Sequence, residues 1–354
     1  MPFASRAGLR RVVAAAVAAP SVHNTQPWRF RRVDDTTVEL YADLDRLLTV
    51  TDPLGRGLGI SCGAALFNLR LAVRMTGHDP RVLPLPDPAD RPELLATVRA
   101  TPGGPPSADE RLLHDMIPHR RTSRFPFDGR PLPRNVLVDL VNAAHDEGAT
   151  LLLVKGGTAR RVLDMVAEAD DTLTADPAYR AELARWTRSE SGPDGVPGHA
   201  AGPRPRTATL PMRDFTTTPL RNGTPPAAIP TTHLHDGAPG TRGFAVSGGP
   251  GGEVADFEAD PQLAALFTRG DGPGDWLRAG QALQRVLLTA TAHGVAASMF
   301  SQPLDLRPPQ HRGDKAGPFG HVQMLIRFGY GPPVPRVPRR PVYEVLDRRG
   351  PRHA

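Results

Sequence analysis

The sequence predicts an α+β protein in which two similar halves are joined in one chain. Three observations lead to this prediction. Apolar residues with helical spacing alternate with short strand-like runs along most of the 354 residues. Segments 63–86 and 280–303 match each other at a constant offset of 217 residues, with glycine, leucine and proline at the same places. Two polar clusters, at 19–30 and 120–124, occur once each and lie in different halves.

Local patterns divide the first half, residues 1–106, into helices and strands. Apolar residues that recur every three or four positions indicate a helix, and alternating β-branched and polar residues indicate a strand. In order, these patterns predict a helix ending at Pro20, strands over 29–33 and 37–41, a long helix over 59–77, a strand over 81–85 and a helix over 93–99.

The second half, residues 107–354, is predicted to follow a similar plan with one long interruption. Residues 189–274 are rich in Gly, Pro, Thr and Arg and show little periodicity, apart from a strand or helix candidate over 263–267. A stretch of this length inside a compact domain is most often a functional lid or a disordered insert. The remaining elements are a helix ending at 117, a helix over 136–144, a strand over 150–154, helices over 158–169, 178–188 and 276–293, strands over 295–299 and 323–328, and a basic tail over 332–354.

The composition is that of a globular protein, with 39% hydrophobic and 23% charged residues. No stretch approaches the roughly 20 apolar residues of a membrane span, and the apolar run 9–19 leads into a polar loop rather than a signal cleavage site. We therefore expect a cytoplasmic protein with no membrane partner. A single cysteine, Cys62, excludes an internal disulfide and a cysteine-based metal cage. His233 and His235 lie in a proline-flanked loop typical of solvated histidines, so no metal site is expected.

The net charge of +6 raises the question of a nucleic-acid partner. The basic residues are spread along the chain rather than gathered in one run with interleaved aromatic residues, so no nucleic-acid binding is expected. A basic nucleic-acid-binding protein stays as the weakest alternative, because two arginine clusters do occur.

The first cluster, residues 19–30, combines short polar side chains with two prolines and a tryptophan. A rigid loop that presents hydrogen-bond donors and acceptors to a planar, heteroatom-rich ligand needs this combination. The alternative is a capped helix end with Trp28 as a core anchor, which explains Pro27 and Trp28 but gives Asn24 and Gln26 no task. The polar residues of the loop are Ser21, His23, Asn24, Thr25 and Gln26.

The second cluster places three arginines and a threonine within residues 120–124. Arginine binds phosphate oxygens in bidentate fashion, and a hydroxyl adds an uncharged donor, so the segment suits a phosphate monoester. A solvated basic turn is the alternative. A second group of arginines, Arg336 with Arg339 and Arg340, occurs at the end of the same half. Its presence makes an isolated solvated turn a weaker explanation.

Three motifs together resemble the nitroreductase superfamily. Pro20-Ser21-x-x-Asn24-x-Gln26-Pro27-Trp28 is similar to its Pro-Ser-x-x-Asn-x-Gln-Pro-Trp signature. Residues 120–124 are similar to its Arg-Arg-Ser-x-Arg element, and residues 339–345 to its C-terminal Arg-Lys/Arg-Pro-Leu-Glu-Glu-Val. The order of the motifs, with segments 275–285 and 302–305, looks most like the Acg-type branch, in which two nitroreductase-like halves share one chain. The resemblance covers nearly the whole chain except residues 189–274.

The resemblance implies an α+β, nitroreductase-like fold whose tandem fused halves form an intramolecular pseudo-dimer. It also implies FMN at the interface, with the first half supplying the loop and the second half supplying the phosphate arginines. One FMN per chain is expected, because each cluster is present in one half only. Position 122 is a threonine where the family usually has serine. The residues implied to contact FMN are Pro20, Ser21, His23, Asn24, Gln26, Trp28, Arg120, Arg121, Thr122, Arg124, Ser301, Gln302, Arg339 and Arg340.

Two functions stay open at this point. In the first, NAD(P)H reduces the flavin, which passes electrons to a small nitro, quinone or similar acceptor without a catalytic side chain. In the second, the insert at 189–274 covers the flavin and the protein sequesters or stores FMN with little turnover. We expect a monomer with an internal pseudo-dimer, and further self-association is left open.

Overall fold

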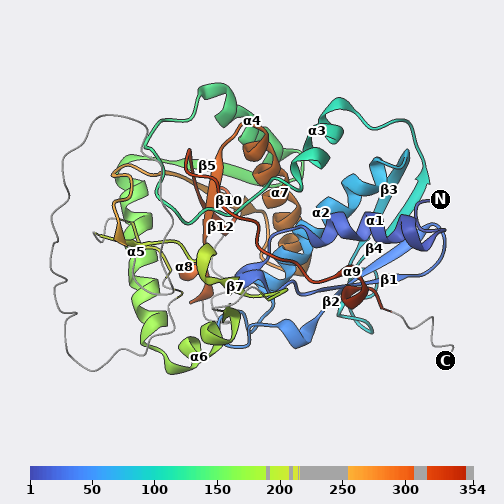
Figure 1. The fold of residues 1–354 in the computed structure, drawn as a ribbon, viewed down its shortest axis with the longest axis horizontal. Helices are drawn as coiled ribbons and strands as arrows, with labels where there is room; N and C mark the ends of the chain where they lie inside the picture. The colour runs from blue at the N-terminus through green and yellow to red at the C-terminus, as the bar shows by residue number, and fades with distance from the viewer. Residues whose placement is uncertain (189–191, 207–209, 214, 216–253, 307–316, 348–354) are drawn as a thin grey trace, which may run out of the picture.

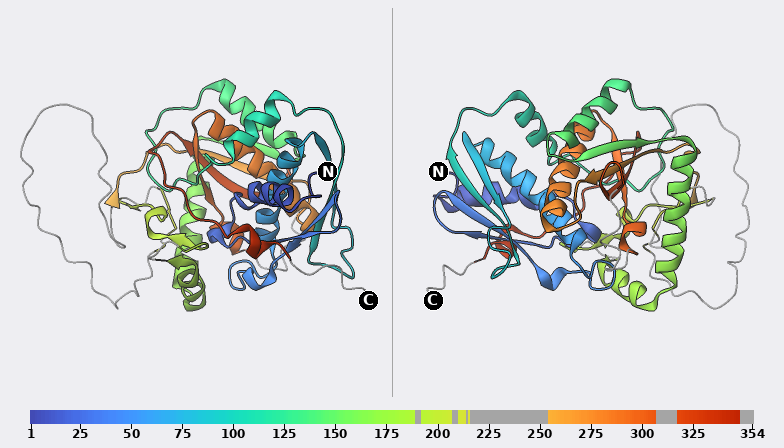
Figure 2. Two further views of the ribbon diagram at one scale, coloured as in Figure 1. Left: turned by 45° about the vertical axis from the view of Figure 1, so that its right-hand side comes forward. Right: turned by 180° about the vertical axis from the view of Figure 1, so that it is seen from behind.

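The computed structural model describes residues 1–188, 192–206, 210–213, 215, 254–306 and 317–347. It contains two four-stranded antiparallel sheets, each with its own hydrophobic core, and two long helices that pack against each other between them (Figures 1 and 2). The predicted α+β fold is therefore confirmed. The histidines at 233 and 235 lie outside the described residues.

The first sheet is built entirely from the first half, in the order β1-β2-β4-β3. Helices α1 (Arg6–Val17) and α2 (Arg56–Arg74) pack against each other, and the side chains that they bury form one core with the sheet. Ser5 caps α1, because its hydroxyl accepts a hydrogen bond from the Gly8 amide at 3.0 Å. The strands are β1 (Trp28–Arg32), β2 (Thr37–Ala42), β3 (His78–Pro84) and β4 (Leu94–Pro102).

The expectation of a helix over 93–99 is wrong, since these residues form β4 in the interior of the sheet. Leu94, Ala96 and Val98 are buried while Thr97 and Arg99 turn to the other face. This alternation is the strand pattern. The adjacent leucines and the alanines, which favour helices, concealed it.

The second sheet has the order β11-β12-β10-β5 and is built from the second half. Strand β10 lies in its interior, so the predicted insert at 189–274 includes a strand of the sheet and, after it, the start of α7. Helix α5 covers one face of the sheet, and α4 and α7 share a core with the other. The elements are α4 (Arg134–His145), β5 (Thr150–Val154), α5 (Gly156–Ala175), β10 (Gln262–Thr268), α7 (Pro273–Ala292), β11 (Ala296–Phe300) and β12 (His321–Gly329).

Helices α2 and α7 cross at two glycines that are related by the sequence repeat. A methyl group on Gly280 would overlap the Ile60 carbonyl oxygen and lie 2.8 Å from the Gly63 Cα. Ile60 and Leu277 are related by the same offset, and each side chain is buried in the core of the opposite half. The two halves are therefore joined by a reciprocal helix pair, as a fused pseudo-dimer requires.

The C-terminal tail returns to the first half. The Asp347 amide donates to the Phe30 carbonyl oxygen at 2.8 Å, and Leu346 forms a parallel bridge with Phe30 on β1. The tail thereby brings residues 335–340 beside the loop at 21–26. The smaller elements are η1 (Val22–Asn24), η2 (Leu44–Arg46), α3 (Ala108–Met116), α6 (Pro177–Trp186), β6 (Thr187–Arg188), β7 (Val196–Pro197), η3 (Gly198–Ala200), β8 (Arg204–Pro205), β9 (Val254–Ala255), α8 (Gln302–Asp305) and α9 (Val342–Val345).

Within the described part of the chain, no helix has both the length and the apolar character that a bilayer crossing needs. The same residues contain no group of three or more His, Cys, Asp or Glu side chains placed to hold a metal ion. Cys62 is buried in α2, and its burial raises the pKa of the thiol.

Candidate functional site

The loop after α1 has a strained backbone. His23, Asn24 and Gln26 have φ angles of 47°, 55° and 51°, in the left-handed region that residues other than glycine rarely adopt. Such strain persists where surrounding contacts hold it, and it gathers at binding sites. Inside the loop, the Ser21 hydroxyl accepts a hydrogen bond from the Gln26 amide at 2.9 Å.

A cavity of about 680 Å³, open to solvent, lies beside this loop and is lined by five arginines. No aspartate or glutamate occurs among the described residues that line it. We call it the arginine cavity. Its guanidinium groups belong to Arg120, Arg121, Arg124, Arg336 and Arg339.

The deepest of these arginines is Arg120, which is only 5% exposed. Among the described residues its Nε has no partner, and one terminal nitrogen reaches the Thr122 hydroxyl at 3.4 Å. Burial, followed by the charges of Arg339 and Arg121, lowers the pKa of Arg120 to about 9. Buried cations are normally paired, so this one lacks an anion.

The pKa values of Arg124 and Arg339 are lowered in the same way. Burial and the neighbouring Arg213 lower the pKa of Arg124 to about 10, and burial with Arg336 and Arg121 does the same for Arg339. The hydrogen bonds that Arg339 donates go to backbone carbonyls, the longest to Ala19 at 3.3 Å. An anion bound in this cavity would relieve the repulsion among the cations.

A second cavity, of about 750 Å³, adjoins the first, and we call it the ring cavity. Pro20, Ser21, Thr122 and Arg124 line both cavities, so the two form one continuous site. Apolar side chains from α2, α7, β11 and β12 line it together with polar groups. This combination suits a planar ligand with heteroatoms at its edge. The apolar residues include Ile60, Ala64, Leu283, Met299 and Met324.

The arginine segment reaches the site because it runs beside β11. Thr122 forms a parallel bridge with Ala297, and the Ser123 amide donates to the Ala297 carbonyl oxygen at 2.9 Å. Arg120 follows directly after α3, where its amide donates to the Met116 carbonyl oxygen at 2.9 Å. Second-half elements thus bring the guanidinium groups to the first-half loop.

The predicted residues Ser301 and Gln302 lie at the start of α8 and line the ring cavity. The Ser301 hydroxyl donates to Asp305 Oδ2 at 2.9 Å, and the Ser301 amide donates to Gln302 Oε1 at 3.1 Å. Asn24 lines the arginine cavity, where its Oδ1 is buried without a partner. An acceptor in this position is suited to a ligand hydroxyl.

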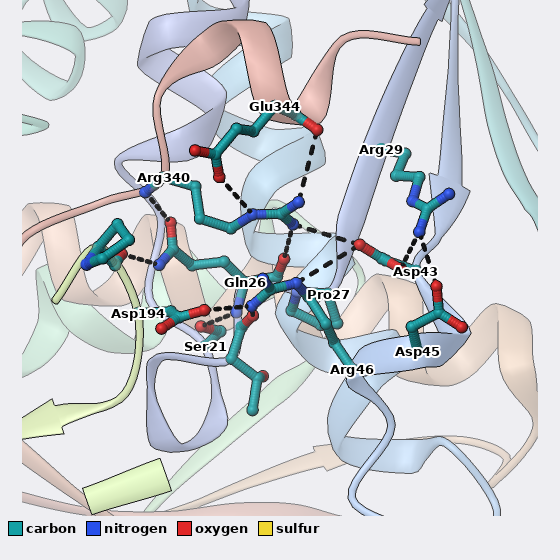
Figure 3. Close-up of polar contacts among 12 residues, drawn as sticks. Ser21, Gln26, Pro27, Arg29, Asp43, Asp45, Arg46, Asp194, Arg340 and Glu344 are labelled. Atoms are coloured by element: carbon teal, nitrogen blue, oxygen red, sulfur yellow. Dashed lines mark hydrogen bonds and ion pairs between the residues drawn. The ribbon is translucent and has the colours of Figure 1, made fainter. Parts of the chain in front are cut away.

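Three predicted site residues, Gln26, Trp28 and Arg340, are not among the lining residues of either cavity. Figure 3 shows the polar contacts of Gln26 and Arg340. Gln26 donates from Nε2 to the Pro193 carbonyl oxygen at 2.8 Å and accepts from the Arg340 amide at 2.8 Å. Arg340 points to Asp43, 3.2 Å away. Trp28 is fully buried in the first core. These residues hold the loop, the tail and the segment at residue 193 together.

The sequence reasoning did not identify Met212, Arg213 and Phe215, which also line the ring cavity. All three belong to the 189–274 stretch, whose composition offers no periodic signal. The Arg124 guanidinium lies 4.7 Å from the centroid of the Phe215 ring and donates to the Ala200 carbonyl oxygen at 2.9 Å. The insert therefore contacts both the ring cavity and an arginine that the two cavities share.

Curated proteins of Mycobacterium tuberculosis match nearly the whole chain. One, provisionally named an NAD(P)H nitroreductase, is 34% identical over 345 residues, which cover 96% of this chain and 91% of that protein. The Acg protein carries the same provisional name and is 29% identical over 357 residues, covering 98% of this chain and 97% of that protein. No protein-family profile matches the chain.

Among solved structures, an FMN-dependent nitroreductase of Mycobacterium smegmatis in complex with NADPH is 16% identical, with a TM-score of 0.33. The alignment covers 66% of this chain and 96% of that one. A structure from Anabaena variabilis, provisionally described as a nitroreductase, is 11% identical with a TM-score of 0.43, covering 84% and 69%.

Proposed function

This chain belongs to the nitroreductase superfamily, together with the Acg protein, and on that premise we propose that it is an FMN-binding oxidoreductase. NAD(P)H would serve as its reductant, and a small nitro, quinone or similar compound as its acceptor. FMN, when bound, supplies the two-electron redox chemistry. The protein supplies the binding site and its electrostatics.

The observation that carries this proposal is the set of buried arginines without carboxylate partners. A phosphate monoester carries a charge between −1.5 and −2 at neutral pH and accepts hydrogen bonds at three oxygens. Arg120, Arg124 and Arg339 would hold it, because their charges lack counter-ions among the described residues of the arginine cavity. The adjoining ring cavity then receives the planar part of the same ligand.

The strained loop would hold the ligand from the other half. Ser21 lines both cavities, so it would lie between the phosphate end and the ring end, and Asn24 lines the arginine cavity. Ser301 and Gln302 would contact the ring from α8. Gln26, Trp28 and Arg340 would act through the loop and the tail that they fix.

We propose one FMN in each chain, because the position related to the ring cavity by the repeat carries different side chains. The offset of 217 replaces Ser61 and Ala64 of the ring cavity with Arg278 and Gln281. Arg70 extends across this position and donates to Gln281 Oε1 at 2.8 Å and to Glu147 Oε2 at 2.6 Å. Arg278 pairs with Asp275 at 2.8 Å. These larger, polar side chains are less suited to an apolar ring than Ser61 and Ala64.

FMN sequestration is a second candidate function, favoured by the insert. Met212, Arg213 and Phe215 line the same cavity as the proposed ring contacts, so the insert would lie against the bound flavin. The segment at 193–195 is fixed to the loop through Gln26 and Asn24. A flavin under these residues would turn over slowly.

The visible spectrum of the purified protein tests the shared part of both functions. Flavin absorbance, or saturable FMN binding by the apoprotein, is the expected result, and a colourless protein that does not bind added FMN contradicts both. The rate of NAD(P)H oxidation with a nitroaromatic or a quinone then separates them. Fast turnover supports the oxidoreductase, and bound FMN without turnover supports sequestration.

Arg120→Ala is expected to weaken FMN binding by about 10- to 100-fold, because a charge-assisted hydrogen bond contributes about 1.5–3 kcal/mol. Fluorescence titration of the apoprotein with FMN measures the Kd. Arg10→Ala is the matched control, since Arg10 is an exposed residue of α1 far from the cavity lining. Equal Kd values for the two variants would contradict the placement of the phosphate.

A further inference from the structure

Arg213 brings a positive charge from the insert into the ring cavity. Its side chain is 9% exposed, and it lines the cavity with Met212 and Phe215. Arg124 is the only other charged side chain among the described lining residues, and it also faces the arginine cavity. Arg213 is therefore the charge that belongs to the ring cavity alone.

Hydrogen-bond contacts with three described residues fix the Arg213 guanidinium. One terminal nitrogen lies 2.9 Å from His23 Nε2, and the other donates to Ser301 Oγ at 3.3 Å and to Asp305 Oδ2 at 2.9 Å. The contacts come from the strained loop and from both ends of α8. Because the contacts come from separate elements, the charge of Arg213 has a fixed position.

His23 adds no charge of its own. A guanidinium group has only donors, so His23 Nε2 must be the acceptor and the ring proton must lie on Nδ1. Burial, and then the charges of Arg213 and Arg124, hold the pKa of His23 well below its usual value. The neutral imidazole thus orients Arg213 without competing with it.

The groups around Arg213 keep it charged. Burial opposes the charge, but Tyr179 and Asp305 outweigh burial and raise the pKa of Arg213, with a smaller effect from Asp170. The guanidinium lies 5.9 Å from the centroid of the Tyr179 ring. Asp305 is not among the lining residues and is shared with Arg56 at 3.7 Å, so it neutralises Arg213 only in part.

We propose that Arg213 sets the reduction potential of the redox ligand in the ring cavity, with His23 and Asp305 as its positioning residues. The proposal rests on the FMN site described above. A hydride from NAD(P)H carries two electrons and a proton, so it leaves one negative charge on a ring system that was neutral. A fixed cation beside the ring stabilises this reduced form relative to the oxidised form.

The test is the two-electron midpoint potential of bound FMN, measured by spectroelectrochemical titration without any acceptor. In Arg213→Gln the preference for reduced over oxidised FMN should fall by about tenfold, which lowers the potential by about 30 mV. In Asp305→Asn the potential should rise, because the cation loses its counter-charge. Arg213→Lys keeps the charge and should stay near the wild-type potential.

Potential shifts of opposite sign in Arg213→Gln and Asp305→Asn would show that Arg213 acts through its charge and not by anchoring the insert. If Arg213 only anchored the insert, removing either partner of the Arg213–Asp305 pair would change the potential in the same direction. Asp256→Asn is the matched control, since Asp256 lies in the insert and pairs with Arg206 at 3.0 Å without lining either cavity. It should leave the potential unchanged.

Bound FMN with an unchanged potential in Arg213→Gln overturns the inference, and so do shifts of equal sign in Arg213→Gln and Asp305→Asn. A wild-type protein that binds no FMN contradicts the proposed function instead. The two failures are therefore distinguishable in one set of proteins.

Discussion

At the scale of single residues, two amide side chains of the same loop differ in their roles. We propose that one contacts the ligand, whereas the other holds parts of the fold together. Asn24 and Gln26 are two residues apart, and both have a left-handed backbone. Asn24 lines the arginine cavity and its buried Oδ1 has no partner among the described residues, whereas both ends of the Gln26 amide are occupied by Pro193 and Arg340. We therefore expect Asn24, and not Gln26, to offer an atom to the proposed ligand.

Asp52 makes stability depend on pH in mildly acid solution. Its carboxylate accepts from the Leu58 amide at 2.8 Å near the start of α2, and burial raises its pKa from 3.8 to about 6. The folded state then binds more protons than the unfolded state between these two values, so stability falls as the pH rises through this window and stays lower above it. The full effect amounts to about 3 kcal/mol.

Asp52→Asn should remove this dependence, because an amide oxygen still accepts from Leu58 but does not titrate. Urea unfolding at pH 4, 5, 6 and 7 measures it. As the pH rises, the wild type should lose stability. The variant should therefore become more stable relative to the wild type. Asp305 has a raised pKa as well and leaves a residual slope of the same sign in the variant. Parallel stability curves for the two proteins would contradict the raised pKa of Asp52.

At the scale of elements, the crossing of α2 and α7 determines how closely the two halves approach. Gly280→Ala places a methyl group against the Ile60 carbonyl oxygen, which is backbone and cannot rotate away. Overpacking of this kind typically costs about 1–3 kcal/mol, and a rigid backbone contact belongs at the upper end. The free energy of unfolding in urea measures the loss.

Gly157→Ala is the matched control for this variant, since Gly157 also lies in a helix but a methyl group there would meet nothing within 4 Å. Its stability should equal or slightly exceed that of the wild type. Gly63→Ala should repeat the effect of Gly280→Ala, because the two glycines face each other. A harmless Gly280→Ala would show that the helices cross farther apart than the structure places them.

The elements also show which parts of the fold a single sequence predicts. The long helices α2 and α7 and strands such as β12 have strong periodicity, and their existence was predicted. Strand β4 was taken for a helix because Leu94 and Leu95 are adjacent and alanines are frequent, although the alternation from Ala96 to Val98 is that of a strand. Burial in the sheet decides such cases, and burial is a tertiary property.

At the scale of the whole molecule, the union of two clusters in one site was predictable and the contribution of the insert was not. The loop at 21–26 and the arginines at 120–124 each carry a chemical signal in their residue types. Arg213 carries none, because one arginine in a Gly/Pro-rich stretch has no partner within reach in the sequence. Its partners His23 and Asp305 lie 190 and 92 residues away, and only folding brings them together.

The internal repeat leads to a prediction about stoichiometry. Titration of the apoprotein with FMN, followed by absorbance, should saturate at one FMN per chain. The Glu147 side chain is 6% exposed and accepts from both Arg70 and Arg285, so its charge depends on these ion pairs. Arg70→Ala should lower the free energy of unfolding by about 2 kcal/mol, since it takes one of two cations from a buried carboxylate.

The same variant should leave the stoichiometry at one, because Arg278 and Gln281 still occupy the place of Ser61 and Ala64. Arg124→Ala is the opposite case. It should weaken FMN binding while the ion pairs around Glu147 stay intact. A second equivalent of FMN bound by the wild type would mean that the repeat retains two working sites, and the asymmetry of its two halves would then need another explanation.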